Sequence, residues 1–110
     1  IKGVFNETSI MYYSYVFNIS IENTQYDHYF SEKLLDPFMF KTIPIYLGCN
    51  KVDTYFPNHV LHLSGKLEND IIYIKNIINN PKKYLINIDT EMVRNKINLI
   101  KNIHNIFNLH

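Results

Sequence analysis

Residues 12–48 read YYSYVFNISIENTQYDHYFSEKLLDPFMFKTIPIYLG, and this stretch sets out a strand, a loop, a helix and a second strand. Residues 42–48, TIPIYLG, form a short apolar run that ends in glycine, as expected of a strand buried on both faces of a parallel sheet. Residues 12–22 carry apolar or aromatic side chains at every second position, which is typical of a strand with one buried face. The alternating residues are Tyr13, Tyr15, Phe17, Ile19 and Ile21.

The segment between the two expected strands predicts a helix. Ser31 stands where an N-cap residue would, directly before EKLLDPFMFK. Pro37 lies past the first turn of this helix, where proline can cost about 3 kcal/mol, so we expect either a kink or a later helix start. The apolar stripe of the helix consists of Leu34, Leu35, Phe38 and Met39.

The rest of the chain continues the alternation of strands and helices. A third strand is predicted at residues 60–63, VLHL, and a helix at residues 67–80. A further short helix can begin in PKKYLINI, because proline suits a first helical position. A final helix would carry Val93, Ile97, Ile100 and Phe107 on one face. We therefore expect an α/β fold with a Rossmann-like, mainly parallel sheet, whose ligands bind at the carboxyl ends of the strands. The loops after residues 22, 47 and 63 would lie at that edge.

Length and composition narrow the classes of function. At 110 residues the chain has room for one compact domain. A formal net charge of +1 gives no electrostatic footprint for nucleic acid, and no run approaches the roughly 20 apolar residues of a membrane span. Cys49 is the only cysteine, which excludes an intrachain disulfide and a cysteine-rich metal site. The chain lacks an initiator methionine, so we expect a partial chain.

Polar and aromatic side chains concentrate in residues 22–33, between the first strand and the helix. The amides at the start of a helix favour an anion, and Lys33 in the first turn adds a positive charge, so a diphosphate fits here. Glu32 can accept hydrogen bonds from sugar hydroxyls, and Tyr26 or Tyr29 can offer a flat face. On spacing alone, the alternative is a solvated Glu-Lys pair that only caps the helix.

The run FNISIENTQYDHYFSEKLLDPFMFKTIPIYLGCNKVDTYF resembles the C-terminal domain of the α1,3-fucosyltransferase family, glycosyltransferase family 10. The resemblance rests on ENxxxxxYFSEK followed by TIPIYLG, and it continues more loosely through VLHL and PKKYL. It implies a GT-B architecture, in which two Rossmann-like domains face a cleft. It also implies inverting transfer of fucose from GDP-fucose to a hydroxyl of an acceptor glycan, with no metal needed for donor binding.

The same resemblance implies roles for individual residues. Lys33 would neutralise the pyrophosphate. Glu32 would bind ribose or fucose hydroxyls and, as the catalytic residue, help to stabilise positive charge at the anomeric carbon. Asn23, Tyr29 and Ser31 would line the donor pocket. The family's general base and a pyrophosphate-binding arginine lie upstream, so residues 1–110 would be a donor-binding domain that lacks the N-terminal, acceptor-binding domain.

Some positions and alternatives remain open at this point. The chain departs from the family pattern at Pro37 and in Tyr46 and Leu47, which affects the identity of the donor sugar most. A GT-B transferase that uses another nucleotide sugar, or a non-catalytic nucleotide-binding remnant, would carry the same phosphate and ribose features. For His28 and Cys49, solvation and packing are the simpler interpretations. We also expect exposed apolar surface on the final helix and on the opening segment around Val4, Phe5 and Met11.

Overall fold

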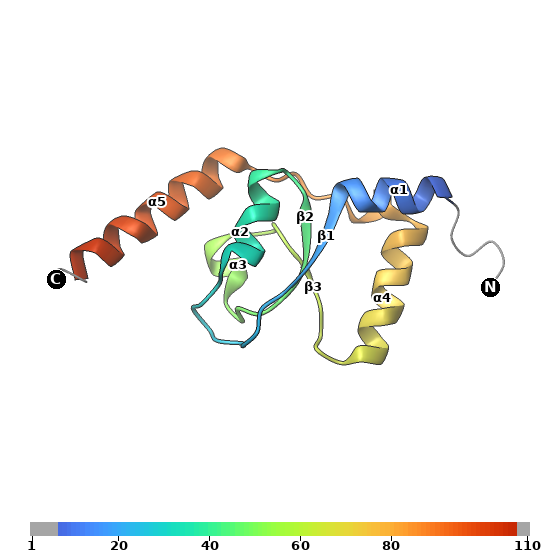
Figure 1. Cartoon of the computed structure of the whole chain (residues 1–110), viewed down its shortest axis with the longest axis horizontal. Helices are drawn as coiled ribbons and strands as arrows, with labels where there is room; N and C mark the ends of the chain where they lie inside the picture. The colour runs from blue at the N-terminus through green and yellow to red at the C-terminus, as the bar shows by residue number, and fades with distance from the viewer. Residues whose placement is uncertain (1–6, 108–110) are drawn as a thin grey trace.

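The computed structural model describes residues 7–107, with side chains up to residue 103. Its centre is a parallel sheet with strand order β1-β2-β3. The strands are β1 (Phe17–Ile21), β2 (Ile43–Leu47) and β3 (Leu61–His62). Phe17 pairs with Ile43, and Ile45 pairs with Leu61. The sheet confirms the α/β class and the parallel arrangement of the three strands (Figure 1).

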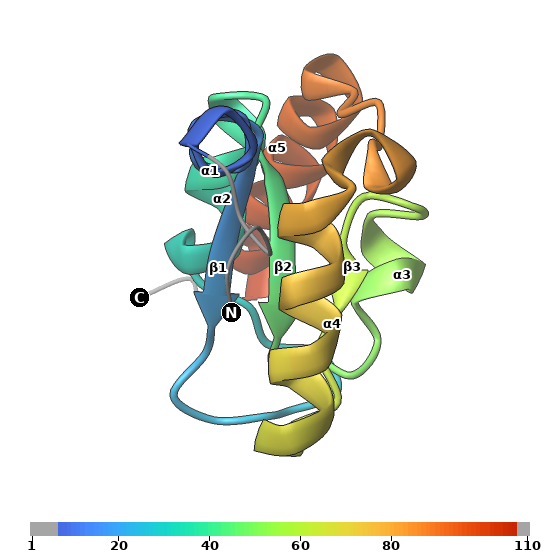
Figure 2. The same ribbon diagram turned by 90° about the vertical axis from the view of Figure 1, so that its right-hand side faces the viewer.

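Helices cover both faces of the sheet, because parallel strands need crossover connections and their two faces must be shielded from water. On one face lie α2 (Glu32–Met39), α3 (Val52–Tyr55) and α5 (Thr90–Phe107) (Figures 1 and 2). On the other lie α1 (Glu7–Val16), α4 (Leu67–Asn79) and the 3-10 helix η1 (Pro81–Tyr84). The described chain is thus a three-layer α/β/α unit.

Strand β2 forms the middle of the core, as its unbroken apolar run predicts. Ile43, Ile45 and Tyr46 are almost fully buried. Phe38 of α2 and Phe56 after α3 pack together above it, with ring centroids 5.1 Å apart. This packing fixes α2 against the sheet, and with it the loop that precedes α2.

The beginning of the first strand is where the sequence prediction was wrong. The strand was expected to include residues 12–16, but these belong to α1, and the strand begins only at Phe17. Tyr13 and Val16, spaced three apart, pack against the core from the helix, and Tyr13 stacks on Phe17 at 5.7 Å. Helical packing against α4 and η1 outweighs the period-two pattern, since tertiary contacts override local pattern.

The buried face of β1 was also assigned wrongly. Ile19 and Ile21 are about half exposed, whereas Phe17 and Ser20 are buried. Within the described residues β1 is an edge strand, with β2 as its one neighbour. An edge position leaves part of an apolar strand uncovered, so alternation alone does not determine which side chains are buried.

Pro37 does not delay the start of α2, contrary to one of the two expected outcomes. The helix begins at Glu32, directly after Ser31, and Pro37 lies inside it with its ring buried. The helix instead ends soon after the proline, where the Pro37 carbonyl accepts hydrogen bonds from the backbone of Phe40 and Thr42. A short helix of eight residues therefore tolerates proline near its carboxyl end.

The expected final helix is present as α5, and its first part packs against α2 and the core. Val93 is buried, Ile97 and Ile100 are partly buried, and Leu99 and Ile103 are about half exposed. Figure 1 shows α5 extending away from the sheet. Apolar surface is therefore exposed on this helix, and also at Met11 of α1, although Val93 does not contribute to it. The side chain of Phe107, with Val4 and Phe5, lies outside the described residues.

Among the residues that the structure describes, none of the helices combines the length and the apolar character that crossing a membrane requires.

Candidate functional site

A pocket of about 370 Å³ lies where β1 ends and α2 begins. This is the carboxyl edge of the sheet, where ligands of parallel α/β sheets bind. The pocket is large enough for a small-molecule ligand, since such sites range from about 300 to 1,000 Å³. Its lining residues are Glu22, Asn23, Thr24, Tyr26, Tyr29, Ser31, Glu32 and Lys33. All five residues proposed from the sequence as donor-binding residues are among them.

The start of α2 forms one wall of the pocket. Ser31 is the N-cap: its backbone is extended, and its hydroxyl accepts a hydrogen bond from the Lys33 amide at 3.2 Å. This arrangement confirms that Ser31 is the N-cap of the helix. The Leu34 amide donates to the Ser31 carbonyl at 3.0 Å, and the helix dipole places partial positive charge at this end.

Lys33 and Glu32 project from this wall with different surroundings. The Lys33 ammonium donates a hydrogen bond to the Asn23 Oδ1 at 3.0 Å. This bond connects the start of α2 with the loop that follows β1. The Glu32 carboxylate is exposed and has no hydrogen-bond or ion-pair partner within the described side chains. A cation that is already oriented and a free carboxylate are therefore both available to a ligand.

Two tyrosines form the aromatic part of the pocket. The rings of Tyr26 and Tyr29 meet edge to face, with centroids 6.4 Å apart and an interplanar angle of 82°. Both are exposed, by 60% and 51% respectively, so their faces and hydroxyls are open to a ligand. A perpendicular pair of this kind can present one ring face and one ring edge to a flat group.

Glu22 lies at the buried floor of the pocket and was given no role in the sequence analysis. It is 6% exposed, and its carboxylate accepts hydrogen bonds from the Ser31 amide at 2.8 Å, the Ser31 hydroxyl at 2.5 Å and the Tyr46 hydroxyl at 2.9 Å. The signal in the sequence is its position, because Glu22 is a charged residue directly after an apolar strand. An acidic side chain that is buried at such a position needs hydrogen-bond partners.

Tyr46 completes this buried network. Its hydroxyl also accepts a hydrogen bond from the Cys49 amide at 3.0 Å. Burial, and then the hydrogen bond and charge of Glu22, raise the pKa of Tyr46 far above its ordinary value, although the Cys49 amide acts in the opposite direction. Tyr46 therefore stays neutral and acts as a donor to Glu22. Gly48 is required beside them, because a Cβ there would overlap the Glu22 Cγ and the Tyr46 ring.

The loop after β2 braces the pocket loop from behind. The Tyr26 carbonyl accepts a hydrogen bond from the Asn50 amide at 3.1 Å, and the Asp27 carbonyl accepts one from the Lys51 amide at 3.2 Å. The Cys49 thiol donates to the same Asp27 carbonyl at 3.0 Å, and burial raises the pKa of the thiol. Cys49 therefore has the structural role that the sequence analysis favoured. The loop after residue 47 supports the pocket without lining it.

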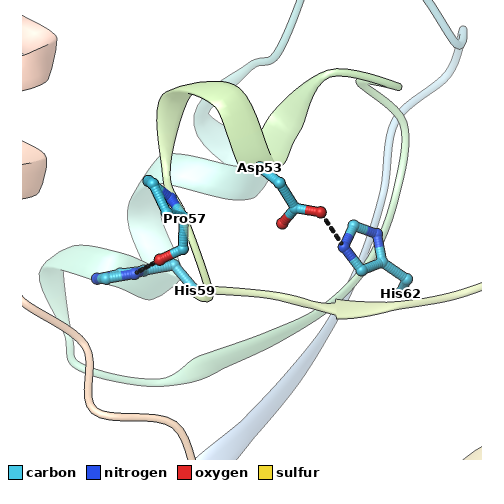
Figure 3. Close-up of polar contacts among 4 residues, drawn as sticks. All are labelled: Asp53, Pro57, His59 and His62. Carbon is cyan, nitrogen blue, oxygen red and sulfur yellow. Dashed lines mark hydrogen bonds and ion pairs between the residues drawn. The ribbon is translucent and has the colours of Figure 1, made fainter.

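The histidines of the described side chains serve other contacts. His28 lies outside the pocket and pairs with the Tyr55 hydroxyl at 2.8 Å. Figure 3 shows His62 bound to Asp53 at 2.8 Å, and His59 against the Pro57 carbonyl. The second ring nitrogen of His59 accepts a hydrogen bond from a backbone amide at 3.0 Å. These contacts give His28 no place near a donor phosphate.

No group of three or more histidine, cysteine or acidic side chains in the described part of the chain is arranged to hold a metal ion.

The fold and the pocket together define the class of protein. A three-layer α/β/α unit with a parallel sheet and a polar pocket at its carboxyl edge is consistent with the Rossmann-like C-terminal domain of a GT-B glycosyltransferase. Residues 4–86 match the family model described as glycosyltransferase family 10 (fucosyltransferase), C-terminal. The chain belongs to this family, as the resemblance of its sequence indicates.

A relative supports the same assignment. The chain is 34% identical to a protein of Acanthamoeba polyphaga mimivirus that bears the name "Putative fucosyltransferase", over 96% of this chain and 20% of the relative. The chain therefore spans about a fifth of the length of this relative. No solved structure matches the chain significantly.

Proposed function

We propose that the pocket at the start of α2 binds the GDP part of GDP-fucose, and that the protein transfers the fucose with inversion to a hydroxyl of an acceptor glycan. The observation that carries this proposal is the position of the Lys33 ammonium. It lies at the positive end of the α2 helix dipole, is oriented by Asn23, and shares one pocket with Glu32 and Tyr29. A positively charged side chain at a helix start favours a diphosphate over neutral ligands.

The proposed chemistry divides between the two charged residues. Lys33 and the positive end of the α2 helix dipole attract the pyrophosphate and stabilise the negative charge that grows on the GDP leaving group as the glycosidic bond breaks. Glu32 accepts hydrogen bonds from ribose or fucose hydroxyls and stabilises the positive charge that develops at the anomeric carbon. Ser31 holds the helix start, and Asn23 and Tyr29 line the pocket. Neither step as proposed requires a metal ion.

The acceptor and the base that deprotonates it are assigned to a second domain. A GT-B enzyme closes two Rossmann-like domains around donor and acceptor. The pocket of this chain lies at the edge of one such domain. The name of the mimivirus relative, and its greater length, favour fucosyl transfer by a longer protein. We therefore place the general base, a further pyrophosphate-binding arginine and the acceptor site outside residues 1–110.

Two alternatives use the same pocket. A GT-B transferase for another nucleotide sugar would keep Lys33 and Glu32, because these residues recognise phosphate and hydroxyl groups before they recognise the hexose. A non-catalytic nucleotide-binding protein would bind GDP and transfer nothing. The family favours GDP-fucose over both alternatives.

A panel of nucleotides and nucleotide sugars separates these functions. We expect the full-length protein to bind GDP more tightly than UDP or ADP in calorimetric titrations, and to transfer sugar from GDP-fucose but not from GDP-mannose or UDP-glucose. NMR of the product should give an anomeric configuration opposite to that of the donor. Transfer from a different donor would support the first alternative, and GDP binding without transfer to any acceptor in a glycan array would support the second.

A further inference from the structure

We infer that Glu22 is a positioning residue for the nucleotide-sugar site: its buried carboxylate holds the start of α2 in the geometry that aims Lys33 and Glu32 into the pocket. This inference rests on the proposed function of the same pocket. Glu22 contributes only to the floor of the pocket, and both of its carboxylate oxygens are already engaged by Ser31 and Tyr46. It acts through the helix and not on the reacting atoms.

The contacts of Glu22 connect three separate segments. Glu22 follows the last residue of β1, and its amide continues the pairing of the sheet through the Leu47 carbonyl at 2.8 Å. Its carboxylate then binds both the amide and the hydroxyl of Ser31, and the hydroxyl of Tyr46 in β2. The end of β1, the carboxyl end of β2 and the N-cap of α2 are therefore fixed to one another by one side chain.

The Ser31 hydroxyl carries this restraint into the first turn of α2. The hydroxyl donates to Glu22 and at the same time accepts from the Lys33 amide. Its proton is thus committed to Glu22, which leaves its lone pairs free to cap the helix. Because Glu32 and Lys33 are the first two residues of α2, a loss of this cap would displace both functional side chains together.

Three donor bonds on one buried carboxylate make the network sensitive to the loss of its charge and its acceptors. A Glu22→Met variant keeps similar bulk but leaves the Ser31 amide and the Tyr46 hydroxyl without an acceptor. A Glu22→Gln variant keeps one acceptor oxygen and should have a smaller effect. Burial between Tyr46 and the Gly48 backbone leaves little space in which these groups could find other partners.

Asp70 provides a matched control. Its carboxylate also accepts three hydrogen bonds close to the start of a helix, from the amide and hydroxyl of Ser64 and from the Gly65 amide. This second clamp orders the loop before α4 and does not line the pocket. An Asp70→Leu variant therefore removes a comparable set of bonds without disturbing α2.

The experiment measures GDP affinity by calorimetry and GDP-fucose kinetics for these variants in the full-length protein. We expect Glu22→Met to weaken GDP binding and to raise the KM for GDP-fucose by roughly 5- to 30-fold, with a lower kcat, and Glu22→Gln to change them by less. Asp70→Leu should leave the Kd and KM within about twofold of wild type. A purely structural role of Glu22 would lower the active fraction, and so kcat, without changing KM.

The outcomes separate this inference from the proposed function. If the wild-type protein binds GDP and the folded Glu22→Met variant keeps its Kd and KM, Glu22 is not a positioning residue. The same conclusion follows if Asp70→Leu causes an equal loss. If Glu22→Met does not fold, Glu22→Gln is decisive, because an unchanged KM in that variant overturns the inference. If the wild-type protein does not bind GDP at all, the proposed function fails, and this inference fails with it.

Discussion

At the scale of single residues, Glu32 and Lys33 are neighbours in sequence but have different chemical surroundings. Lys33 is oriented by Asn23 through a 3.0 Å hydrogen bond, whereas the Glu32 carboxylate is free within the described side chains. A cation that is oriented before the ligand arrives suits binding in the ground state. A carboxylate without a fixed partner can instead strengthen its contacts as the reaction proceeds. The two side chains should therefore respond differently to substitution.

A Glu32→Gln variant tests this division of roles. The amide retains shape and can still accept one hydrogen bond, but it cannot stabilise positive charge at the anomeric carbon. We expect kcat to fall by roughly 10²-fold or more while the Kd for GDP changes by less than about threefold, since the interaction is made mainly in the transition state. Initial-rate kinetics and GDP calorimetry on the same preparation give both numbers. A loss of GDP affinity with an unchanged kcat would assign Glu32 to ground-state binding alone.

At the scale of helices and strands, two carboxylates order two helix starts at the same edge of the sheet. Glu22 fixes α2, and Asp70 fixes the loop before α4. Desolvation acts to raise the pKa of Asp70, but the three hydrogen bonds from Ser64 and Gly65 outweigh it and leave the pKa below its ordinary value. The ionised form is therefore the one that the folded loop favours.

This shift predicts an acid-sensitive contribution to stability. A carboxyl whose folded pKa is depressed stabilises the fold fully above its unfolded pKa of about 3.9, and the contribution is lost as the pH falls through the lower, folded value. We expect Asp70→Asn to lower the urea midpoint of unfolding at pH 6. Between pH 5 and pH 3 the midpoint of this variant should change less than that of the wild type. Parallel pH profiles for the two proteins would contradict this assignment.

The sequence predicts some of these elements well and others poorly, for physical reasons. The run IPIYL specifies β2 because a strand buried on both faces needs apolar side chains at every position. Ser31 specifies the start of α2 because its hydroxyl caps the helix. Residues 12–16 were assigned to a strand because tyrosines alternate there, and only packing against α4 and η1 makes them helical.

The candidate site shows the same contrast. The residues that line the pocket are close together in sequence, so one loop and one helix start are enough to predict that they meet. The network at the pocket floor depends on Tyr46 and Gly48, which lie more than 20 residues after Glu22 in the chain. A hydrogen bond between such distant residues leaves no local pattern. Glu22 therefore could be noticed in the sequence as part of the loop but could not be given a role.

At the scale of the whole molecule, the sheet brings loops from separate parts of the chain to one edge and uses them for different purposes. The loop after β1 lines the pocket, and the loop after β2 braces it through the backbone of Asn50 and Lys51. Further exposed apolar side chains lie away from this edge, on α5 at Leu99 and Ile103 and on α1 at Met11. The pocket itself combines charged and polar groups with two exposed tyrosine rings.

Calorimetry with GDP on a Lys33→Ala variant of the full-length protein tests whether this edge binds a nucleoside diphosphate through Lys33. Lys75→Ala, on the exposed side of α4, serves as the matched control for the loss of one positive charge. A charge-assisted contact to phosphate contributes about 1.5 to 3 kcal/mol, so Lys33→Ala should weaken GDP binding by roughly 10- to 150-fold, and Lys75→Ala should leave it unchanged. Wild-type affinity in Lys33→Ala, or an equal loss in both variants, would show that Lys33 does not bind the diphosphate.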